Sequence, residues 1–327
     1  MFKGWIDLQV NGYKGIDFSN PNITLKEIIK LNKMFLKIGI LGYCPTIISS
    51  PIEVYEHNLP LIYEASKYNN GAKILGIHLE GPFINSKEGP RGVHPRKYII
   101  PPSIDLFERY QDLSNNSIVI ITLAPECAGA FELIEHIIDT GNTIVSIGHS
   151  VATREIINGA VNLGVKAATH VGNGLSSTIN RHNNPLWPIL ANDNLSAFFI
   201  CDGFHLPIDL IKVGLRSKRI SKFIVTSDMV HLSGLSPGSY DFKGTRVVLE
   251  SNGKLHVEKS KKLAGSSLNI MECMNFMASM DVLNEEELRM IGFTNALKLL
   301  NKKIDKNTYQ NAPKIRYENN KFSIYDA

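Results

Sequence analysis

Four apolar, strand-like segments of this chain each end in a side chain that can bind a metal ion or transfer a proton. The segments are Lys73–Glu80, Thr143–His149, Val165–His170 and Phe223–Asp228. A charged group at the end of a buried strand costs several kcal/mol unless it is paired or ligated. Because α/β barrels carry their chemistry at the carboxyl ends of their strands, we expect the four end residues to share one polar site.

Glu80, His149 and His170 together indicate a metal-binding site. Alone, Glu80 suits an ion pair at a strand end as well as it suits a metal, and a single histidine is more often a hydrogen-bonded loop or core residue. Two histidines and one carboxylate at three strand ends favour a metal. Three protein ligands plus a water are the arrangement of a catalytic zinc site, in which the pKa of the water falls to near neutral. Iron or another divalent metal suits the same ligands.

Asp228 and His205 are the candidates for moving a proton and polarising a substrate. Asp228 ends the last barrel strand, where a carboxylate beside a metal-bound water can take a proton and return it to the leaving group. The common alternative for such an aspartate is an N-cap. His205 follows the seventh predicted strand, where it can polarise a carbonyl or cap the next helix.

Strand-like segments alternate with amphipathic helical ones along most of the chain, which is typical of βαβ units. Eight predicted strands favour a closed barrel, and no GxGxxG follows the first strand, so a dinucleotide-binding fold lacks its signature. The predicted strands are Trp5–Val10, Gly42–Ile48, Ile74–Leu79, Ile118–Leu123, Thr143–Ile147, Ala167–His170, Ser196–Ile200 and Phe223–Thr226. The predicted helices between them include Leu25–Ile38, Phe131–Thr140, Thr153–Leu163 and Leu206–Arg216.

Beyond the eighth strand the pattern changes. Arg246–Glu258 reads as two alternating runs around Asn252-Gly253, which predicts a type I′ hairpin. Two further strand-like pieces surround Asn319-Asn320 near the end of the chain. We expect a barrel domain over residues 1–300, which includes the 246–258 hairpin, and a C-terminal tail over residues 301–327.

Composition excludes several classes of function. The 327 residues fit a single α/β barrel, and 43% hydrophobic with 20% charged residues is ordinary for a globular protein. The net charge is only +4 and there is no dense Lys/Arg run, so the sequence does not indicate a basic surface that would bind nucleic acid. There is no secretory signal and no apolar run of membrane-span length. The four cysteines are scattered without a CxxC pair, which favours reduced thiols. We expect a cytoplasmic protein with no membrane or nucleic-acid partner.

Short motifs in this chain resemble the N-acetylglucosamine-6-phosphate deacetylase branch of the amidohydrolase superfamily. HLEGPF at His78–Phe83, GHS at Gly148–Ser150 and THVGN at Thr169–Asn173 are the specific ones, and they are joined in order by WIDLQVNG, TLAPE, DGFHL, TSD and LAGSSL. The resemblance implies a (β/α)8 TIM barrel of the metal-dependent hydrolase type. It also implies hydrolysis of the acetamido group of a small amino-sugar substrate with one or two divalent metals.

The resemblance also implies a role for each candidate residue. Asp228 looks like the acid/base for attack by metal-bound hydroxide, and His205 looks like the group that polarises the acetyl carbonyl. Glu80, His149 and His170 look like the metal ligands. The implied substrate contacts are His94, Asn173, Gly174, Arg181 and His205, of which Arg181 would bind the phosphate because a guanidinium fork suits that group.

Gln9-Val10-Asn11 stands where many amidohydrolases have His-x-His. Neutral amides are poor ligands for a zinc-like ion, so we predict one tight metal, with Gln9 and Asn11 hydrogen-bonding to the metal-bound water or to a group behind the ligands.

The chain starts four residues before its first predicted strand, so we expect the usual small β-sandwich domain to be absent or reduced, with the tail as its remnant. We predict that a homo-oligomer, most simply a dimer, covers the barrel surface left open. The loop around Arg181 continues with His182-Asn183-Asn184-Pro185 and differs from the family's pattern. It leaves open whether the substrate is phosphorylated.

Two other functions remain open from the sequence. One is hydrolysis of another N-acyl or cyclic amide, which uses the same metal and acid/base groups. The other is a non-catalytic, sugar-binding barrel. The intact set of metal-ligand and proton-transfer candidates favours an enzyme.

Overall fold

Eight parallel strands form the central sheet of the computed structural model, which describes residues 2–260 and 262–325. Neighbouring strands follow the order β1-β4-β6-β7-β8-β9-β10-β11, and the short β5 (Lys73–Ile74) pairs with β4. Their bounds are β1 Trp5–Val10, β4 Ile40–Ile48, β6 Ile77–Glu80, β7 Ile118–Leu123, β8 Ile144–Ile147, β9 Ala167–Ala168, β10 Ser196–Ile200 and β11 Phe223–Thr226. A bridge between Val10 and Met229 brings the last strand back to the first, and the sheet is a nearly closed (β/α)8 barrel, as predicted.

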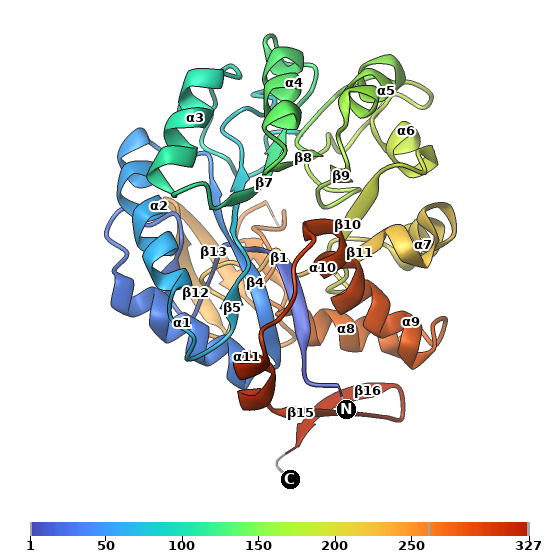
Figure 1. Ribbon diagram of the computed structural model, residues 1–327. Helices are drawn as coiled ribbons and strands as arrows, with labels where there is room; N and C mark the ends of the chain where they lie inside the picture. The colour runs from blue at the N-terminus through green and yellow to red at the C-terminus, as the bar shows by residue number, and fades with distance from the viewer. Residues whose placement is uncertain (1, 261, 326–327) are drawn as a thin grey trace.

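Helices surround the strands (Figure 1). They are α1 Leu25–Lys37, α2 Ile52–Ser66, α3 Ile104–Leu113, α4 Ala130–Thr140, α5 Arg154–Leu163, α6 Leu186–Ala191, α7 Ile208–Lys222, α8 Ile270–Ser279, α9 Glu285–Arg289, α10 Asn295–Leu300 and α11 Lys306–Asn311, with a π-helical turn at Met290–Thr294. In α1, a capping box between Thr24 and Glu27 starts the helix, and Ile28, Leu31 and Phe35 form its buried face. None of the helices in the described residues is long and apolar enough to span a bilayer.

One predicted strand is wrong as a single element. The segment Ile74–Leu79 divides into β5 and β6 at Leu75-Gly76, because Gly76 has φ +138° and no room for a Cβ beside Val119. The register against β4 shifts there by one residue, as Gly42 pairs with Lys73 but Thr46 pairs with His78. This shift sets which face of β6 carries Glu80, since strand side chains alternate.

The predicted type I′ turn at Asn252-Gly253 is also wrong. β13 (Thr245–Leu249) and β14 (Leu255–Val257) are antiparallel, but Leu249 pairs with Leu255, so five residues connect them. A tight two-residue turn instead joins β12 (Gly238–Phe242) to β13 at Lys243-Gly244, whose φ values of 55° and 78° are those that a type I′ turn requires.

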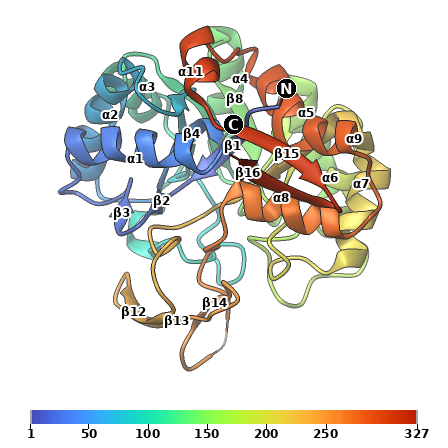
Figure 2. The same ribbon diagram turned by 90° about the horizontal axis from the view of Figure 1, so that it is seen from below.

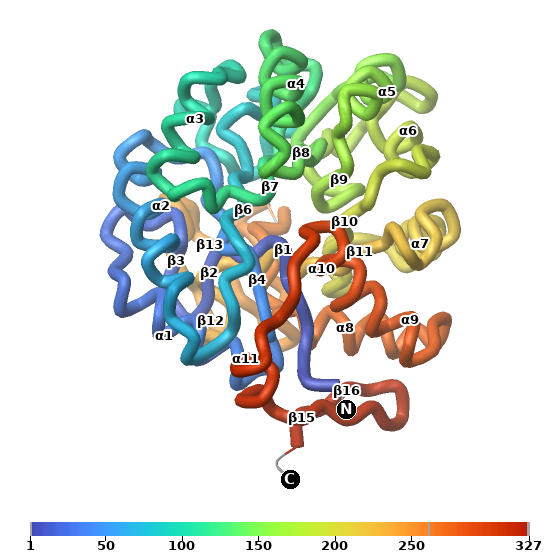
Figure 3. The backbone as a smooth tube through the Cα atoms, viewed as in Figure 1, coloured from blue at the N-terminus to red at the C-terminus, as the bar shows by residue number. Residues whose placement is uncertain are grey.

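Two of the small sheets, β12–β14 and β15–β16, lie at opposite ends of the barrel (Figure 2). β12–β14 has its own apolar cluster, built on Val247, Leu249 and Leu255, at the carboxyl end of the strands. β15 (Lys314–Glu318) and β16 (Lys321–Tyr325) pack at the amino end, where the Phe322 ring meets Trp5 with centroids 4.7 Å apart. Figure 3 follows this terminal hairpin beside the N-terminal segment.

A buried chain of hydrogen bonds crosses the barrel interior beneath the carboxyl rim. Burial lowers the pKa of His78 to about 4, so its ring is neutral near pH 7 and carries one N–H. Nδ1 lies 2.9 Å from the Leu8 carbonyl, which can only accept, so Nε2 accepts from the Thr122 hydroxyl at 2.7 Å. Thr122 therefore accepts from Thr169 at 2.7 Å, and Thr169 accepts from Ser146 at 2.6 Å. The chain of donors runs in one direction and fixes the residue before His170.

We predict that Thr122→Val lowers the free energy of unfolding by about 1–3 kcal/mol, because it leaves His78 Nε2 and the Thr169 hydroxyl without their partner. Urea denaturation measures the change. Thr245→Val, the same substitution at an exposed position of β13, is the control, and its free energy of unfolding should be close to that of the wild type. Equal stability of the two variants would contradict the directed chain.

Candidate active site

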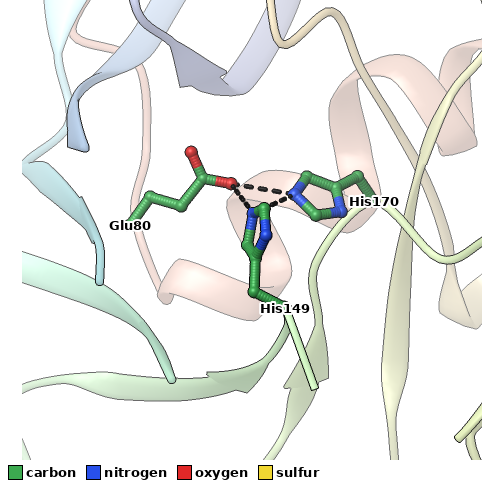
Figure 4. A group of neighbouring side chains, drawn as sticks. All are labelled: Glu80, His149 and His170. Carbon is green, nitrogen blue, oxygen red and sulfur yellow. Dashed lines mark hydrogen bonds and ion pairs between the residues drawn. The ribbon is translucent and has the colours of Figure 1, made fainter. Parts of the chain in front are cut away.

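Three of the four strand-end residues have left-handed backbone conformations. The φ values are 52° at His149, 32° at His170 and 51° at Asp228. Such conformations are unfavourable for residues other than glycine and cluster at functional sites. At the fourth end, the chain turns at Gly81, with φ 85°. The turns bring side chains from different strands into one place (Figure 4).

Glu80, His149 and His170 converge on one point. Glu80 Oε1 lies 3.0 Å from His149 Nε2 and 2.8 Å from His170 Nε2, and the two nitrogens are 3.0 Å apart. All three side chains are at least nine-tenths buried. No other strand end in the described residues contributes a His, Cys, Asp or Glu to such a group.

The protonation states of this cluster favour a cation at its centre. His149 Nδ1 lies 2.6 Å from the Pro90 carbonyl, which can only accept, so a neutral His149 presents the lone pair of Nε2 to Glu80 Oε1. His170 Nδ1 is buried without a partner. Two electron-pair donors 3.0 Å apart repel each other unless a proton or a metal lies between them. Two imidazole nitrogens and a carboxylate oxygen are ligands that a zinc-like divalent ion prefers, so the residues present fit such an ion.

Two side-chain amides, Gln9 on β1 and Asn11 directly after β1, hold the two carboxylates of the site. Gln9 Nε2 donates to Glu80 Oε1 at 2.8 Å, and Asn11 Nδ2 donates to Asp228 Oδ1 at 2.7 Å. Gln9 and Asn11 are thus adjacent to the cluster, where the sequence places them. Each amide orients an acceptor and brings no charge to the site.

Asp228 lies in an environment that disfavours its charge. Burial, and then the charge of Glu80, raise the pKa of Asp228 to about 8. Its backbone is held from behind by Asp7, whose carboxylate accepts hydrogen bonds from the Thr226 hydroxyl and from the Ser227 backbone N–H. A carboxylic acid with a pKa near neutral can both accept and donate a proton.

His94 lies against the metal-ligand candidates. The Ser49 N–H donates to His94 Nδ1 at 3.3 Å, so the neutral ring carries its proton on Nε2, which faces Glu80 Oε2 at 3.7 Å. Burial, and then the neighbouring His149, hold the pKa of His94 well below its usual range. His94 is therefore a neutral N–H donor at the edge of the cluster.

A cavity with about 470 Å³ of empty volume opens above the cluster. It is lined by six predicted residues, namely Asn11, Glu80, His94, His149, His170 and Asp228. The sequence did not predict the other eight lining residues, of which four have charged or aromatic side chains: Asp17, His231, Phe242 and Lys243. Asp17 ends β3 (Ile16–Asp17), which pairs with β2 (Gly12–Tyr13), His231 lies in the segment after β11, and Phe242 and Lys243 lie where β12 enters its turn to β13. None of these positions ends a barrel strand. Among these segments, only the dipeptide Lys243-Gly244 has a local sequence feature, a glycine at a turn position, that indicates its structure.

Four predicted substrate contacts lie outside this cavity. Asn173 and Gly174 line a neighbouring hollow on the other side of His149, where the Asn173 side-chain nitrogen is buried without a partner. His205 is held by Asp202 through a 2.6 Å bond from Nδ1. Arg181 is exposed and lines neither hollow, and its carbonyl accepts from the Trp187 indole.

Glu126, in the TLAPE motif, fixes the loop that follows His149. Its carboxylate accepts from Ser150 Oγ at 2.6 Å, from Val151 N at 2.7 Å and from Asn85 Nδ2 at 2.8 Å. The Asn85 N–H in turn donates to the His149 carbonyl at 3.1 Å. These bonds explain the role of Glu126 in the motif, because they hold the loop in which His149 has its left-handed conformation.

We predict that the protein retains one divalent metal per chain and that His149→Asn abolishes this stoichiometric binding, because only two ligands remain. Elemental analysis after desalting and a competitive chelator titration measure it. His136→Asn is the matched control, because His136 lies on α4 and pairs with Glu108 on α3, away from the cluster. Its metal content should equal that of the wild type. Unchanged affinity in the His149 variant would place the metal elsewhere.

No family model matches the chain. It is 33% identical over 289 residues to N-acetylglucosamine-6-phosphate deacetylase of Caenorhabditis elegans, a match that covers 84% of this chain and 67% of that protein. The Bacillus subtilis protein of the same name is 30% identical over 306 residues, with 92% and 75% covered. The crystal structure of the Pasteurella multocida enzyme matches with a TM-score of 0.82 and 27% identity, with 91% and 76% covered. The chain belongs to the N-acetylglucosamine-6-phosphate deacetylase family.

Proposed function

We propose that this protein hydrolyses the acetamido group of N-acetylglucosamine-6-phosphate to acetate and the free amino sugar. The observation that carries the proposal is the convergence of Glu80, His149 and His170 in one cavity with Asp228. Relatives named for this deacetylation share the chain over most of its length.

Glu80, His149 and His170 would hold one divalent metal, for which we propose zinc because two nitrogens and one oxygen form a usual zinc ligand set. When bound, such a metal polarises a carbonyl and lowers the pKa of water. Gln9 and Asn11, as neutral amides, do not supply a second set of ligands. Their role is to keep the Glu80 and Asp228 carboxylates in position.

Asp228 is the proton carrier of the proposed reaction. A water oxygen bonds to the acetyl carbon, and Asp228 takes a proton from that water. The C–N bond then breaks, and Asp228 returns the proton to the departing nitrogen, so that acetate and an amine result. The Asn11 amide holds Oδ1 through this cycle, which leaves Oδ2 for the reacting atoms.

Further contacts to the substrate are proposed for four residues. His94 lines the cavity, and its Nε2–H would donate to a sugar hydroxyl or to the acetamido oxygen. Asp202 fixes the His205 ring through Nδ1, so Nε2 is the atom that would polarise the carbonyl. Asn173 and Gly174 would receive the part of the sugar that reaches the hollow beyond His149. At Gly174 a Cβ would lie 3.1 Å from His149 Nδ1, which explains the glycine.

We also propose that the protein forms a homodimer through α6 and α7. Trp187 on α6 is 46% exposed, and Ile208 and Val213 on α7 are 46% and 42% exposed. The two helices pack against each other, and exposed large apolar side chains on neighbouring helices are typical of an interface.

We predict that Asp228→Asn lowers kcat for acetate release by about 10²–10⁴-fold, the usual contribution of a general acid–base group. Metal content should not change, because Asp228 is not one of the three ligands. Asp241→Asn, on an exposed position of β12, is the control for loss of one negative charge. Full turnover in the Asp228 variant would exclude the proposed proton transfer.

We predict that Trp187→Ser converts a dimer into a monomer, because it removes the largest apolar side chain of the proposed interface. Static light scattering at micromolar concentration gives the mass directly. A wild type that is already monomeric would refute the dimer.

A further inference from the structure

The first and last strands of the barrel are joined by the side chain of Asp7. β1 and β11 stand at the two ends of the strand order, no ladder pairs them among the described residues, and the bridge between Val10 and Met229 lies beyond the last residue of β11. Asp7 Oδ1 accepts from the Thr226 hydroxyl at 2.8 Å and from the Ser227 N–H at 3.1 Å. The carboxylate thus takes the place that a backbone carbonyl has elsewhere in the sheet.

Both oxygens of Asp7 act as acceptors. Oδ1 also accepts from the Gln9 N–H at 3.3 Å, and Oδ2 accepts from the Ser227 hydroxyl. Burial raises the pKa of Asp7 to about 6, and the hydrogen bonds from Ser227 and Thr226 oppose that shift, so the group is mainly ionised at pH 7. Among the described residues, no lysine, arginine or histidine forms an ion pair with it. Four donors therefore converge on a negative charge that no cation compensates.

A buried carboxylate is a costly way to join two strands. Asp7 is fully buried, and an ionised group without a cation loses several kcal/mol of hydration. It does not line the cavity, so it contacts neither the substrate nor the metal ligands. A backbone pair or a threonine hydroxyl would join β1 to β11 without a charge. Departures of this kind from the rules of folding are expected where a residue serves function.

Asp7 holds the residues on both sides of Asp228. Ser227 precedes Asp228, and its hydroxyl, which donates to Asp7, accepts from the Met229 N–H at 3.1 Å. The Met229 carbonyl in turn accepts from the Asn11 N–H at 2.9 Å. These bonds tie both neighbours of Asp228 to the β1 segment and maintain its φ of 51°. In that conformation the Asp228 carboxyl group meets the Asn11 side-chain amide at 2.7 Å.

We propose that Asp7 is a positioning residue for the proton transfer, because it holds the left-handed turn that presents the Asp228 carboxylate to the reacting atoms. The inference rests on the proposed deacetylase function. It adds a residue that affects the reaction through Asp228 alone, from beneath the cavity floor.

A double-mutant cycle of Asp7→Asn and Asp228→Asn tests the proposal, with acetate release from N-acetylglucosamine-6-phosphate as the measured activity. Asparagine keeps the shape of Asp7, but its amide N–H faces a Ser227 hydroxyl that already donates. We expect Asp7→Asn to lower kcat about 10- to 100-fold, the effect of a misplaced reacting group, with KM within about threefold. In the Asp228→Asn background the same change should alter kcat less than about twofold.

Two further variants complete the cycle. Asp241→Asn makes the same chemical change at an exposed position of β12, and its kcat should equal that of its parent in both backgrounds. Ser227→Ala keeps the charge of Asp7 and removes the hydroxyl that links it to Met229. It should lower kcat by a smaller factor than Asp7→Asn, again only while the Asp228 carboxylate is present, so it carries the test if Asp7→Asn does not fold. Elemental analysis should find the metal content of the wild type in every variant.

The crystal structure of Asp7→Asn gives a readout that needs no activity. We expect the distance between Asn11 Nδ2 and Asp228 Oδ1 to exceed about 3.5 Å, the limit of a hydrogen bond, while Glu80, His149 and His170 keep their places.

Equal losses of kcat from Asp7→Asn in both backgrounds, a rise in KM without a fall in kcat, or an unmoved Asp228 in the crystal would overturn the proposal. A wild type that releases no acetate would instead refute the deacetylase function, and the crystal structure would still decide whether Asp7 positions Asp228.

Discussion

The site depends on three electron-pair donors held at about 3 Å from one another in a buried place. Glu80, His149 and His170 repel one another there unless a cation joins them, and burial denies them water as a screen. A fold that keeps such a group must offset, through other interactions, the free energy of folding that this repulsion costs. A divalent metal bound by these three side chains would supply that stabilisation, because metal binding in such a site contributes to the free energy of folding.

The barrel meets this constraint with rigid support from several directions. Backbone strain at His149, His170 and Asp228 aims the side chains inward, and Glu126 holds the His149 loop in its conformation. From below, the His78–Thr122–Thr169 hydrogen bonds fix the approach to His170. The amides of Gln9 and Asn11 orient both carboxylates. The β12–β14 sheet then closes one side of the mouth with Phe242 and Lys243.

Residues that end barrel strands were predictable from the sequence, and residues that arrive from elsewhere were not. Apolar runs with polar ends place Glu80, His149, His170 and Asp228, because parallel strands of a closed barrel share one rim. β1, β7, β10 and β11 have their predicted bounds, as nearly all of their residues are buried. The break at Gly76 and the turn at Lys243-Gly244 depend on tertiary contacts, with Val119 and with His231 through Phe242. The turn residues offered a local signal for the turn itself, but no local pattern reports that tertiary contacts place Lys243 at the cavity.

The central claim is that one metal is bound by these three side chains and by no ligand from β1. An anomalous diffraction map at the metal absorption edge, from crystals of the metal-loaded protein, tests it most directly. The account predicts a single peak within bonding distance of Glu80 Oε1, His149 Nε2 and His170 Nε2. A peak centred between the Gln9 and Asn11 side chains, or two peaks of comparable height, would contradict it.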